Sequence, residues 1–381
     1  VFRATWAEGQ APTRRRARVR RGDPKSIRDA VWVELLDAPG ASEQTGAELE
    51  EFFQDNVKYV YELPEAIALL ANGAPRRPGR EYQIKVLGHD RDTNQLALER
   101  LPDHGTLASF PNTIGLKRQL DAIEQLRDMP DPAHRPLVQL FEDINRIQWP
   151  AFEPSLLSDS DWLVLTDPTR PGTLRQREFV AKALATPDFA ILEGPPGSGK
   201  TTAICELVLQ TVRRRGGRVL LCASTHVAVD NVLERIMDPD SENGRWINPL
   251  RIGDAGDAKD TVAGFLWEER RRSDIKHIRH HLSHRADSRA AQQLGRCLDS
   301  KQSLHRLLLD TSNLICGTTI GIMRLLGLVD DRRAFGPGSF DMLIIDEASK
   351  TTFAEFLVPA LLARRWVLVG DPKQLSPYVD V

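Results

Sequence analysis

The sequence predicts an α/β fold, with a mostly parallel sheet and flanking helices that bind a nucleotide, preceded by a small β-barrel and a helical stalk. A complete G-x-x-x-x-G-K-T motif at residues 194–201 stands between an apolar run typical of a buried strand and a run with helical spacing. Four later apolar runs end in polar or acidic residues, as strands do when their carboxyl ends form a ligand site. Changes of hydrophobic period upstream predict the barrel and the stalk.

Composition fits an ordinary globular protein. The 381 residues leave room for two or three domains, 41% of them are hydrophobic, and the net charge is -2. The four cysteines form no C-x-x-C pair, which favours neither a disulfide framework nor a cysteine zinc site and fits a cytoplasmic location. No apolar run approaches the ~20 residues that span a bilayer, so we expect no membrane partner. The excess of Arg over Lys suits phosphate contacts, but a GC-rich genome explains it equally well.

Residues 1–110 are expected to form the small β-barrel, because short β-rich runs alternate there with turns. Residues 81–101 resemble a hairpin. The basic run 14–21 is either a nucleic-acid contact or a solvated loop.

Residues 111–150 change to a helical period and predict the stalk. Apolar residues within 114–126 follow one helical face, and a second face runs through 137–147, after a break at Asp131-Pro132.

The nucleotide-binding domain is expected at 151–381, with a helical insert at about 255–312. The insert is rich in Arg and His, and two pairs of histidines lie four residues apart, so each pair would share a helix face. The pairs are His277 with His281 and His280 with His284. A zinc site would need further ligands; the alternatives are a basic face near phosphates and a solvated surface.

The phosphate-binding loop has the residues that its chemistry needs. Its glycines let backbone N–H groups wrap a phosphate chain, and the helix that follows points its positive end at the charge. Lys200 would reach the outer phosphates and the Thr201 hydroxyl would hold Mg2+. The expected nucleotide-binding residues are Gly194, Pro195, Pro196, Gly197, Ser198, Gly199, Lys200, Thr201 and Thr202.

Two glutamines and two carboxylates complete the expected site. The Gln176 amide could bind adenine, although a surface glutamine is the plainer interpretation. Asp346 would hold Mg2+ through water, and Glu347 would orient or deprotonate the attacking water. Gln374, after the last core strand, is either a sensor of the γ-phosphate or a helix-start amide.

Two further strand ends carry polar residues. The stretch 224–231 follows the strand at 218–223 and could hold a nucleic-acid backbone. Within it, the alternative for Asp230 is a residue at a helix start. The strand at 314–319 ends in hydroxyls.

Together these motifs stand in the order found in superfamily 1 helicases. The sequence most closely resembles the branch that contains the up-frameshift RNA helicase of nonsense-mediated decay, the senataxin-type helicases and the replication nuclease-helicase. The motifs are Gln176, GPPGSGKTT (194–202), STHVAVDN (224–231), CGTT (316–319), DEAS (346–349) and GDPKQL (370–375). The resemblance implies a RecA-like motor domain and accounts for the barrel, stalk and insert upstream of and within it.

The resemblance also implies ATP and Mg2+ as ligands and movement from 5′ to 3′ on a single strand. It implies adenine contact by Gln176 and coupling of the γ-phosphate to nucleic acid by Gln374. The implied catalytic residues are Lys200, Asp346, Glu347 and Gln374, and the implied Mg2+ residues are Thr201 and Asp346. The residues that match strand-contacting positions are Thr225, His226, Thr318 and Thr319.

The sequence departs from the family at three points. Ser-Thr-His at 224–226 differs from the Pro-Ser-Asn of the RNA-decay member and resembles the nuclease-helicase, which favours DNA. Lys350 stands where Gln is usual. The second motor domain, which supplies the arginines that stabilise the transferring phosphoryl group, does not occur before Val381. We therefore expect this chain to bind nucleotide but to hydrolyse it poorly without that domain or a partner chain.

The leading hypothesis is an ATP-dependent helicase or translocase on single-stranded DNA or RNA. The alternative is a nucleic-acid-gated ATPase switch that remodels a complex without unwinding. The intact Lys200, Asp346 and Glu347 disfavour a scaffold that does not hydrolyse nucleotide.

Overall fold

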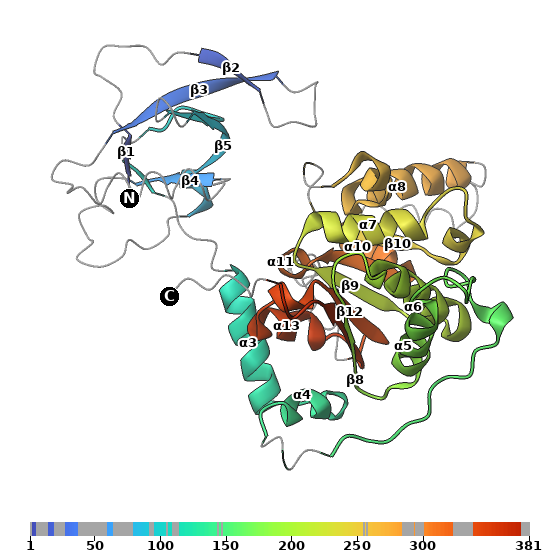
Figure 1. Cartoon of the computed structure of the whole chain (residues 1–381). Coiled ribbons are helices and arrows are strands. Elements are labelled where there is room, and N and C mark those ends of the chain that lie inside the picture. Colours follow the sequence, from blue (N-terminus) through green and yellow to red (C-terminus); the bar gives the residue numbers. More distant parts are fainter. Residues whose placement is uncertain are drawn as a thin grey trace. The chain divides into compact units, whose positions relative to one another are not determined.

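The computed structural model forms two compact units, residues 1–113 and 114–381 (Figure 1). It describes residues 2–4, 14–18, 27–36, 59–63, 79–90, 95–103, 106–108, 114–142, 145, 148–253, 256, 258–283, 293, 301–322 and 338–374. Within these residues no helix is long and apolar enough to cross a membrane.

The first unit is a small antiparallel barrel. Its strands are β1 (Phe2–Ala4), β2 (Arg14–Arg18), β3 (Ile27–Leu36), β4 (Tyr59–Glu62), β5 (Gln83–Asp90), β6 (Gln95–Leu98) and β7 (Thr106–Ala108). They follow the order β1-β7-β4-β5-β6-β3-β2, and β1 also pairs with β3, which closes a ring of six strands. Alternate residues such as Val60, Ile84 and Leu98 fill its core. The predicted barrel and the β5–β6 hairpin are confirmed.

The basic run coincides in part with β2, which pairs with β3 on one side. Residues 19–21 of that run lie outside the described residues. Its role in nucleic-acid binding stays a prediction.

The second unit is built on a parallel sheet of six strands. These are β8 (Phe189–Glu193), β9 (Val219–Ala223), β10 (Pro249–Ile252), β11 (Leu314–Thr318), β12 (Met342–Asp346) and β13 (Trp366–Gly370), in the order β10-β11-β9-β12-β13-β8. All five strand pairs are parallel. The predicted RecA-like fold is confirmed.

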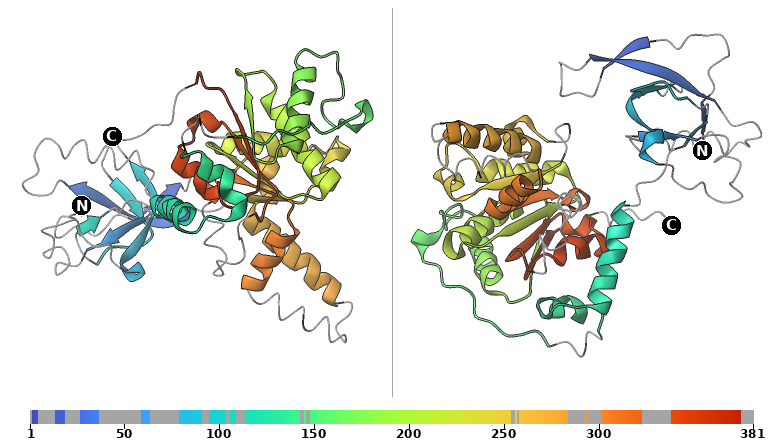
Figure 2. Two further views of the ribbon diagram at one scale, coloured as in Figure 1. Left: turned by 90° about the horizontal axis from the view of Figure 1, so that it is seen from below. Right: turned by 180° about the vertical axis from the view of Figure 1, so that it is seen from behind.

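Helices cover both faces of this sheet (Figure 2). On one face lie α5 (Thr173–Ala185), α6 (Lys200–Arg215) and α7 (His226–Ile236); on the other lie α8 (Trp267–Ser283), α10 (Lys301–Thr311) and α13 (Phe353–Ala360). In β9, Val219 and Leu221 pack in one apolar cluster with residues of α5, α6 and α7. Leu220 and Cys222 pack in a second cluster with residues of α8, α10 and α13. This alternation buries both sides of the strand and explains its continuous apolar sequence.

The helices of the expected stalk pack within the second unit. They are α3 (Ile114–Asp128) and α4 (Arg135–Gln139). Ala122 and Leu126 of α3 are buried in the same apolar cluster as α13. Leu116 and Leu120, which the sequence places on the apolar face, are 65% and 59% exposed. The small Ala122 lets α3 approach closely, and the hydrophobic period alone did not identify it.

Candidate nucleotide and nucleic-acid site

One edge of the parallel sheet brings the motifs together. The phosphate loop follows β8, the GDPKQ stretch follows β13, the DEAS stretch follows β12, the STH stretch follows β9, and Thr318 ends β11. These five strands are neighbours in the sheet, and parallel strands end at the same edge.

Two glycines shape the phosphate loop. Gly197 and Gly199 have φ of 79° and 83°, a region that favours glycine. Gly199 is also the N-cap of α6. A Cβ at Gly199 would lie 2.2 Å from Nε2 of Gln176, so the glutamine side chain would have to move to admit any side chain there.

The long polar side chains of the loop region donate to loop carbonyls. Lys200 Nζ donates to the carbonyls of Gly194 (2.6 Å) and Pro195 (3.0 Å), and Gln176 Nε2 donates to the Ser198 carbonyl (2.9 Å). The Gly194 N–H in turn donates to the carbonyl of Gly370 at the end of β13 (3.1 Å). The structure therefore places Gln176 and Lys200 at opposite ends of one loop, and their roles at adenine and phosphate stay predictions.

The two carboxylates at the end of β12 have different environments. Asp346 is buried, and this burial raises the pKa of its carboxyl above the ordinary value, although the N–H of Glu347 donates to it (2.9 Å). For Glu347, burial acts to raise the pKa, but hydrogen bonds from Ser224 and Lys350 outweigh it, so the pKa is lowered. Glu347 is therefore ionised at neutral pH, as a base must be.

Glu347 is held in an unusual conformation. It is the one non-glycine residue among those described that has a positive φ, 55°, which costs on the order of 1–2 kcal/mol. Its carboxylate accepts hydrogen bonds from Ser224 Oγ (2.6 Å) and Thr225 Oγ1 (3.2 Å), and pairs with Lys350 Nζ (3.0 Å). Glu347 thus connects the end of β12 with the loop that leads from β9 to α7.

A buried ion pair joins β10 to α7, the helix to which that loop leads. Arg251 of β10 pairs with Asp230 of α7 at 2.8 Å, with side-chain exposures of 0% and 1%. Arg251 Nη2 also lies 3.1 Å from Nδ1 of His226. Since arginine can only donate, His226 Nδ1 is the acceptor. The N-cap of α7 is Thr225, so the helix-start alternative for Asp230 is wrong: this carboxylate is a buried partner within the helix.

The four residues expected to touch a strand differ in exposure. Thr225 is exposed and His226 is half-buried. Thr318 and Thr319 are only 7% and 4% exposed, and their hydroxyls bond to the Gly321 N–H and the Ala223 carbonyl. A side-chain contact by either threonine would require a rearrangement around β11.

Gln374 lies in the turn after β13, where its N–H donates to the Asp371 carbonyl (3.0 Å). That turn is close to the end of β12, because a Cβ at Gly370 would lie 3.2 Å from the N–H nitrogen of Ser349. The Gln374 side chain is half-buried.

Comparisons with known proteins agree with this arrangement. A family model described as "AAA domain" matches residues 174–301 and 266–380. The chain belongs to this AAA domain family. It is 30% identical to DNA-binding protein SMUBP-2 of Rattus norvegicus over 231 residues, which are 53% of this chain and 21% of that protein. It is 28% identical to the DNA replication ATP-dependent helicase/nuclease DNA2 of Mus musculus over 287 residues, 75% of this chain and 22% of that protein.

The chain is also similar to a third relative. The Regulator of nonsense transcripts 1 homolog of Drosophila melanogaster is 28% identical over 219 residues, 56% of this chain and 17% of that protein. These matches confirm the predicted membership of the up-frameshift branch of superfamily 1 helicases. The chain spans about a fifth of the length of these relatives.

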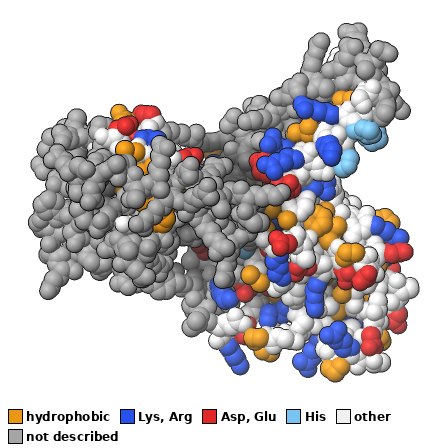
Figure 3. Space-filling model, turned by 90° about the horizontal axis from the view of Figure 1, so that it is seen from above, with side chains coloured by type: hydrophobic (Ala, Val, Ile, Leu, Met, Phe, Trp, Pro, Cys, Tyr) orange, Lys and Arg blue, Asp and Glu red, His pale blue; other side chains and the backbone are white. Residues whose placement is uncertain are grey.

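Helix α8 of the insert is rich in Arg, Lys and His, and Figure 3 shows such side chains gathered on that part of the molecule. Several arginines there pair along the helix, such as Arg271 with Glu268 and Arg272 with Glu269. Among the described residues, no group of three His, Cys, Asp or Glu could hold a metal ion. His284 lies outside the described residues. The other three histidines of the two pairs, His277, His280 and His281, are described and form no such group.

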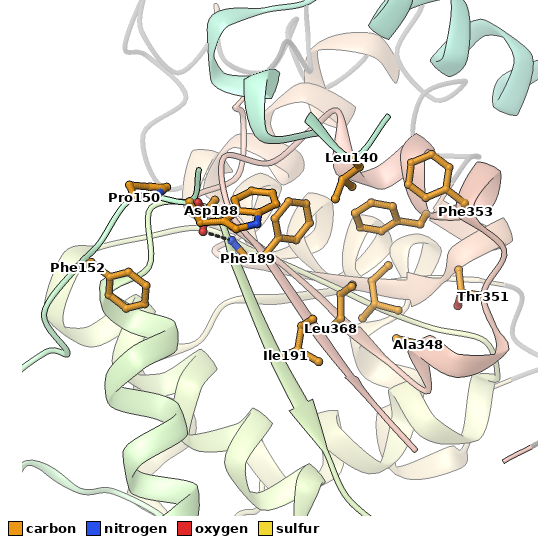
Figure 4. Close-up of a pocket in the computed structure, with 13 residues that line it drawn as sticks. Leu140, Pro150, Phe152, Asp188, Phe189, Ile191, Ala348, Thr351, Phe353 and Leu368 are labelled. Atoms are coloured by element: carbon orange, nitrogen blue, oxygen red, sulfur yellow. Dashed lines mark hydrogen bonds between the residues drawn. The ribbon is translucent and has the colours of Figure 1, made fainter. Parts of the chain in front are cut away.

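The AAA domain also has an apolar groove that sequence analysis did not predict. It has a volume of about 560 Å³ and lies against β8 and α13 (Figure 4). Ile191 of β8 is 63% exposed there, and Trp149 packs edge-on against Phe189 with ring centres 5.8 Å apart. Its lining also includes Trp149 and Phe152, which are 44% and 40% exposed.

Proposed function

We propose that this chain is the first motor domain of an ATP-dependent helicase or translocase that moves 5′ to 3′ on single-stranded nucleic acid. The observation that carries the proposal is Glu347, which extends from the carboxylate pair of β12 to the hydroxyls of Ser224 and Thr225. A group that activates water thus contacts a loop expected to hold the strand.

The residues at the phosphate loop fit a nucleotide with Mg2+. The donor set combines helix N–H groups, the Lys200 ammonium and the Gln176 amide, and both side chains could exchange loop carbonyls for phosphate and adenine. Thr201 and Asp346 would hold Mg2+, which neutralises charge on the phosphates when bound. Glu347 would accept the proton of the attacking water.

Gln374 would link nucleotide state to nucleic-acid contact. It lies in the turn after β13, and the carbonyl that ends β13 accepts the N–H of Gly194 in the phosphate loop. A change at the γ-phosphate could therefore move this turn.

Thr225 and His226 would contact the strand first, with Thr318 and Thr319 joining after rearrangement. The relatives named DNA-binding protein and DNA replication helicase/nuclease support DNA as the strand, as does the Ser-Thr-His sequence. Cations of α8 would add salt-dependent attraction.

Hydrolysis at a useful rate would need an arginine from a second motor domain or a partner chain. Such arginines contribute on the order of 10^3–10^5 in rate.

A second candidate is a nucleic-acid-gated ATPase switch without unwinding. The hydrogen bonds of Ser224 and Thr225 to Glu347 favour it, because a strand that takes over these hydroxyls would free the carboxylate.

The test is nucleotide binding and hydrolysis by this chain, with and without single-stranded DNA, beside a Lys200→Ala variant. We expect nucleotide binding that Lys200→Ala abolishes and little turnover. No binding of ATP or ADP would refute the proposal. On a protein that includes the second motor domain, strand displacement separates the helicase from the switch: DNA-stimulated hydrolysis without displacement would favour the switch.

A further inference from the structure

We infer that Arg235, in the last turn of α7, is a further nucleotide-binding residue, whose guanidinium contacts the α-phosphate of a nucleotide in the phosphate loop. The inference rests on the proposed nucleotide site and adds a second cation to it. Arg235 lies outside all of the motifs that carry the helicase resemblance.

A contact between two helices carries the inference. Arg235 Nη1 donates to Oγ1 of Thr202 (2.9 Å), the third residue of α6. One turn later in α6, the Cys205 thiol lies 3.8 Å from the carbonyl of Val232, one turn earlier in α7. These two contacts fix the end of α7 beside the first turn of the helix that begins at the phosphate loop.

The charge of Arg235 has no carboxylate partner in the described part of the chain. The side chain is exposed. By contrast, the exposed Arg245 of the same unit pairs with Glu242 at 2.7 Å. The dipole of α7 favours a cation at its last turn, but it does not require that cation to reach across to α6. An arginine with several unused donors beside a phosphate loop is suited to phosphate.

The position of Thr202 indicates which phosphate Arg235 would contact. Lys200 Nζ bonds to carbonyls at the start of the loop, and the lysine of such a loop reaches the outer phosphates. Thr202 lies two residues farther on, past the Mg2+ residue Thr201. A cation held at Thr202 is therefore placed for the inner phosphate, which ATP, ADP and AMP share. We expect Arg235 to strengthen binding of all three alike, and not to act on the transferred phosphate.

The experiment is a fluorescence titration of the full chain with ATP, ADP and AMP for five proteins: wild type, Lys200→Ala, Arg235→Gln, Arg235→Lys and Arg245→Gln. Arg235→Gln keeps a donor for Thr202 but removes the charge. It should weaken binding of each nucleotide by roughly 10–150-fold, the range expected for loss of a charge-assisted hydrogen bond. Arg235→Lys keeps the charge and should lose less. Arg245→Gln, a matched charge removal away from the loop, should bind like wild type.

The outcomes separate this inference from the proposed function. If wild type and Arg235→Gln bind ATP, ADP and AMP equally well while Lys200→Ala binds poorly, the nucleotide site stands and the role of Arg235 is refuted. If Arg235→Gln weakens ATP but neither ADP nor AMP, the α-phosphate assignment is wrong. If wild type binds none of the three, both proposals fail. Thermal unfolding of each variant shows whether a loss of binding is a loss of fold; a folded Arg235→Lys then decides.

Discussion

The two ends of the motif-bearing sheet edge hold their side chains in different ways. At the β8 end, Lys200 and Gln176 bond to backbone carbonyls of a surface loop. At the β9–β11 end, the Asp230–Arg251 pair is almost fully buried, and Thr318 and Thr319 are nearly so. The first set of bonds can be exchanged for ligand bonds, whereas the second set belongs to the core.

This difference predicts that the two ends respond differently to a ligand. The Gln176 bond is neutral and contributes about 0.5–1.5 kcal/mol net, and the bonds of the Lys200 ammonium contribute about 1.5–3 kcal/mol each. An anionic phosphate accepts more strongly than a neutral carbonyl, so a phosphate chain can replace the loop carbonyls without a net loss. A buried ion pair cannot be opened at such a cost. We therefore expect the nucleotide end to be ready for its ligand, and the β9–β11 end to act as a rigid support that presents Thr225 and His226.

The largest effect should come from breaking the buried pair. Asp230→Asn leaves the Arg251 charge buried without its counter-charge, which should lower the free energy of unfolding by about 3–5 kcal/mol in urea titrations. The control is Glu242→Gln, which removes an exposed pair with Arg245 and should cost no more than about 1 kcal/mol. Equal stability of the two variants would contradict the rigid-support interpretation.

The next effect concerns Gly199. Gly199→Ala combines a left-handed φ with a Cβ that would meet the Gln176 amide, so we expect weaker nucleotide binding and a loss of about 1–2 kcal/mol of stability. Adding Gln176→Ala should relieve the clash but not the φ cost. Gly264→Ala, where a Cβ has open space and φ is not positive, is the control. A double variant as stable as wild type would show that φ contributes nothing.

A smaller effect tests the strain at Glu347. Both Glu347→Gly and Glu347→Ala lose the bonds to Ser224 and Thr225, but only glycine relieves the positive φ. The glycine variant should therefore be more stable than the alanine variant by about 1 kcal/mol, as measured by chemical unfolding. The reverse order would mean that this conformation costs nothing.

The sequence could predict the sheet and the glycine-rich loop between β8 and α6, because both follow from local patterns. Apolar runs predict buried strands, and the G-x-x-x-x-G-K-T spacing fixes a loop whose residues are consecutive. It could not predict that Asp230 pairs with Arg251, since these residues lie on different elements and meet only when β10 adds to the sheet. For the same reason it missed Ser224 as a partner of Glu347 and Arg235 as a neighbour of Thr202.

The predicted strand contacts of Thr318 and Thr319 show a second limit. A hydroxyl at a strand end looks available in a sequence, but whether it faces water depends on the helices that cover that end. Here Gly321 and Ala223 supply bonding partners within the fold.

The smallest expected effect is the pH dependence of stability that the neighbouring carboxyls of Asp346 and Glu347 contribute. Burial raises the pKa of Asp346 above its ordinary 3.8, so Asp346 contributes stability at lower pH that is lost as pH rises through the folded value. The lowered pKa of Glu347, where bonds from Ser224 and Lys350 outweigh burial, gives the opposite sign: its contribution is present above about 4.5 and is lost as pH falls through the folded value.

Relative to wild type, Asp346→Asn should therefore gain unfolding free energy as pH rises from about 3 to 7, while Glu347→Gln should lose it, each on the order of 1 kcal/mol or less. Urea titrations at both ends of that range measure the two slopes. Slopes of the same sign would contradict the contrast between the desolvated carboxyl of Asp346 and the hydrogen-bonded carboxylate of Glu347. Opposite slopes would show that burial of one carboxyl and hydrogen bonds to the other shift the pKa values of two adjacent residues in opposite directions.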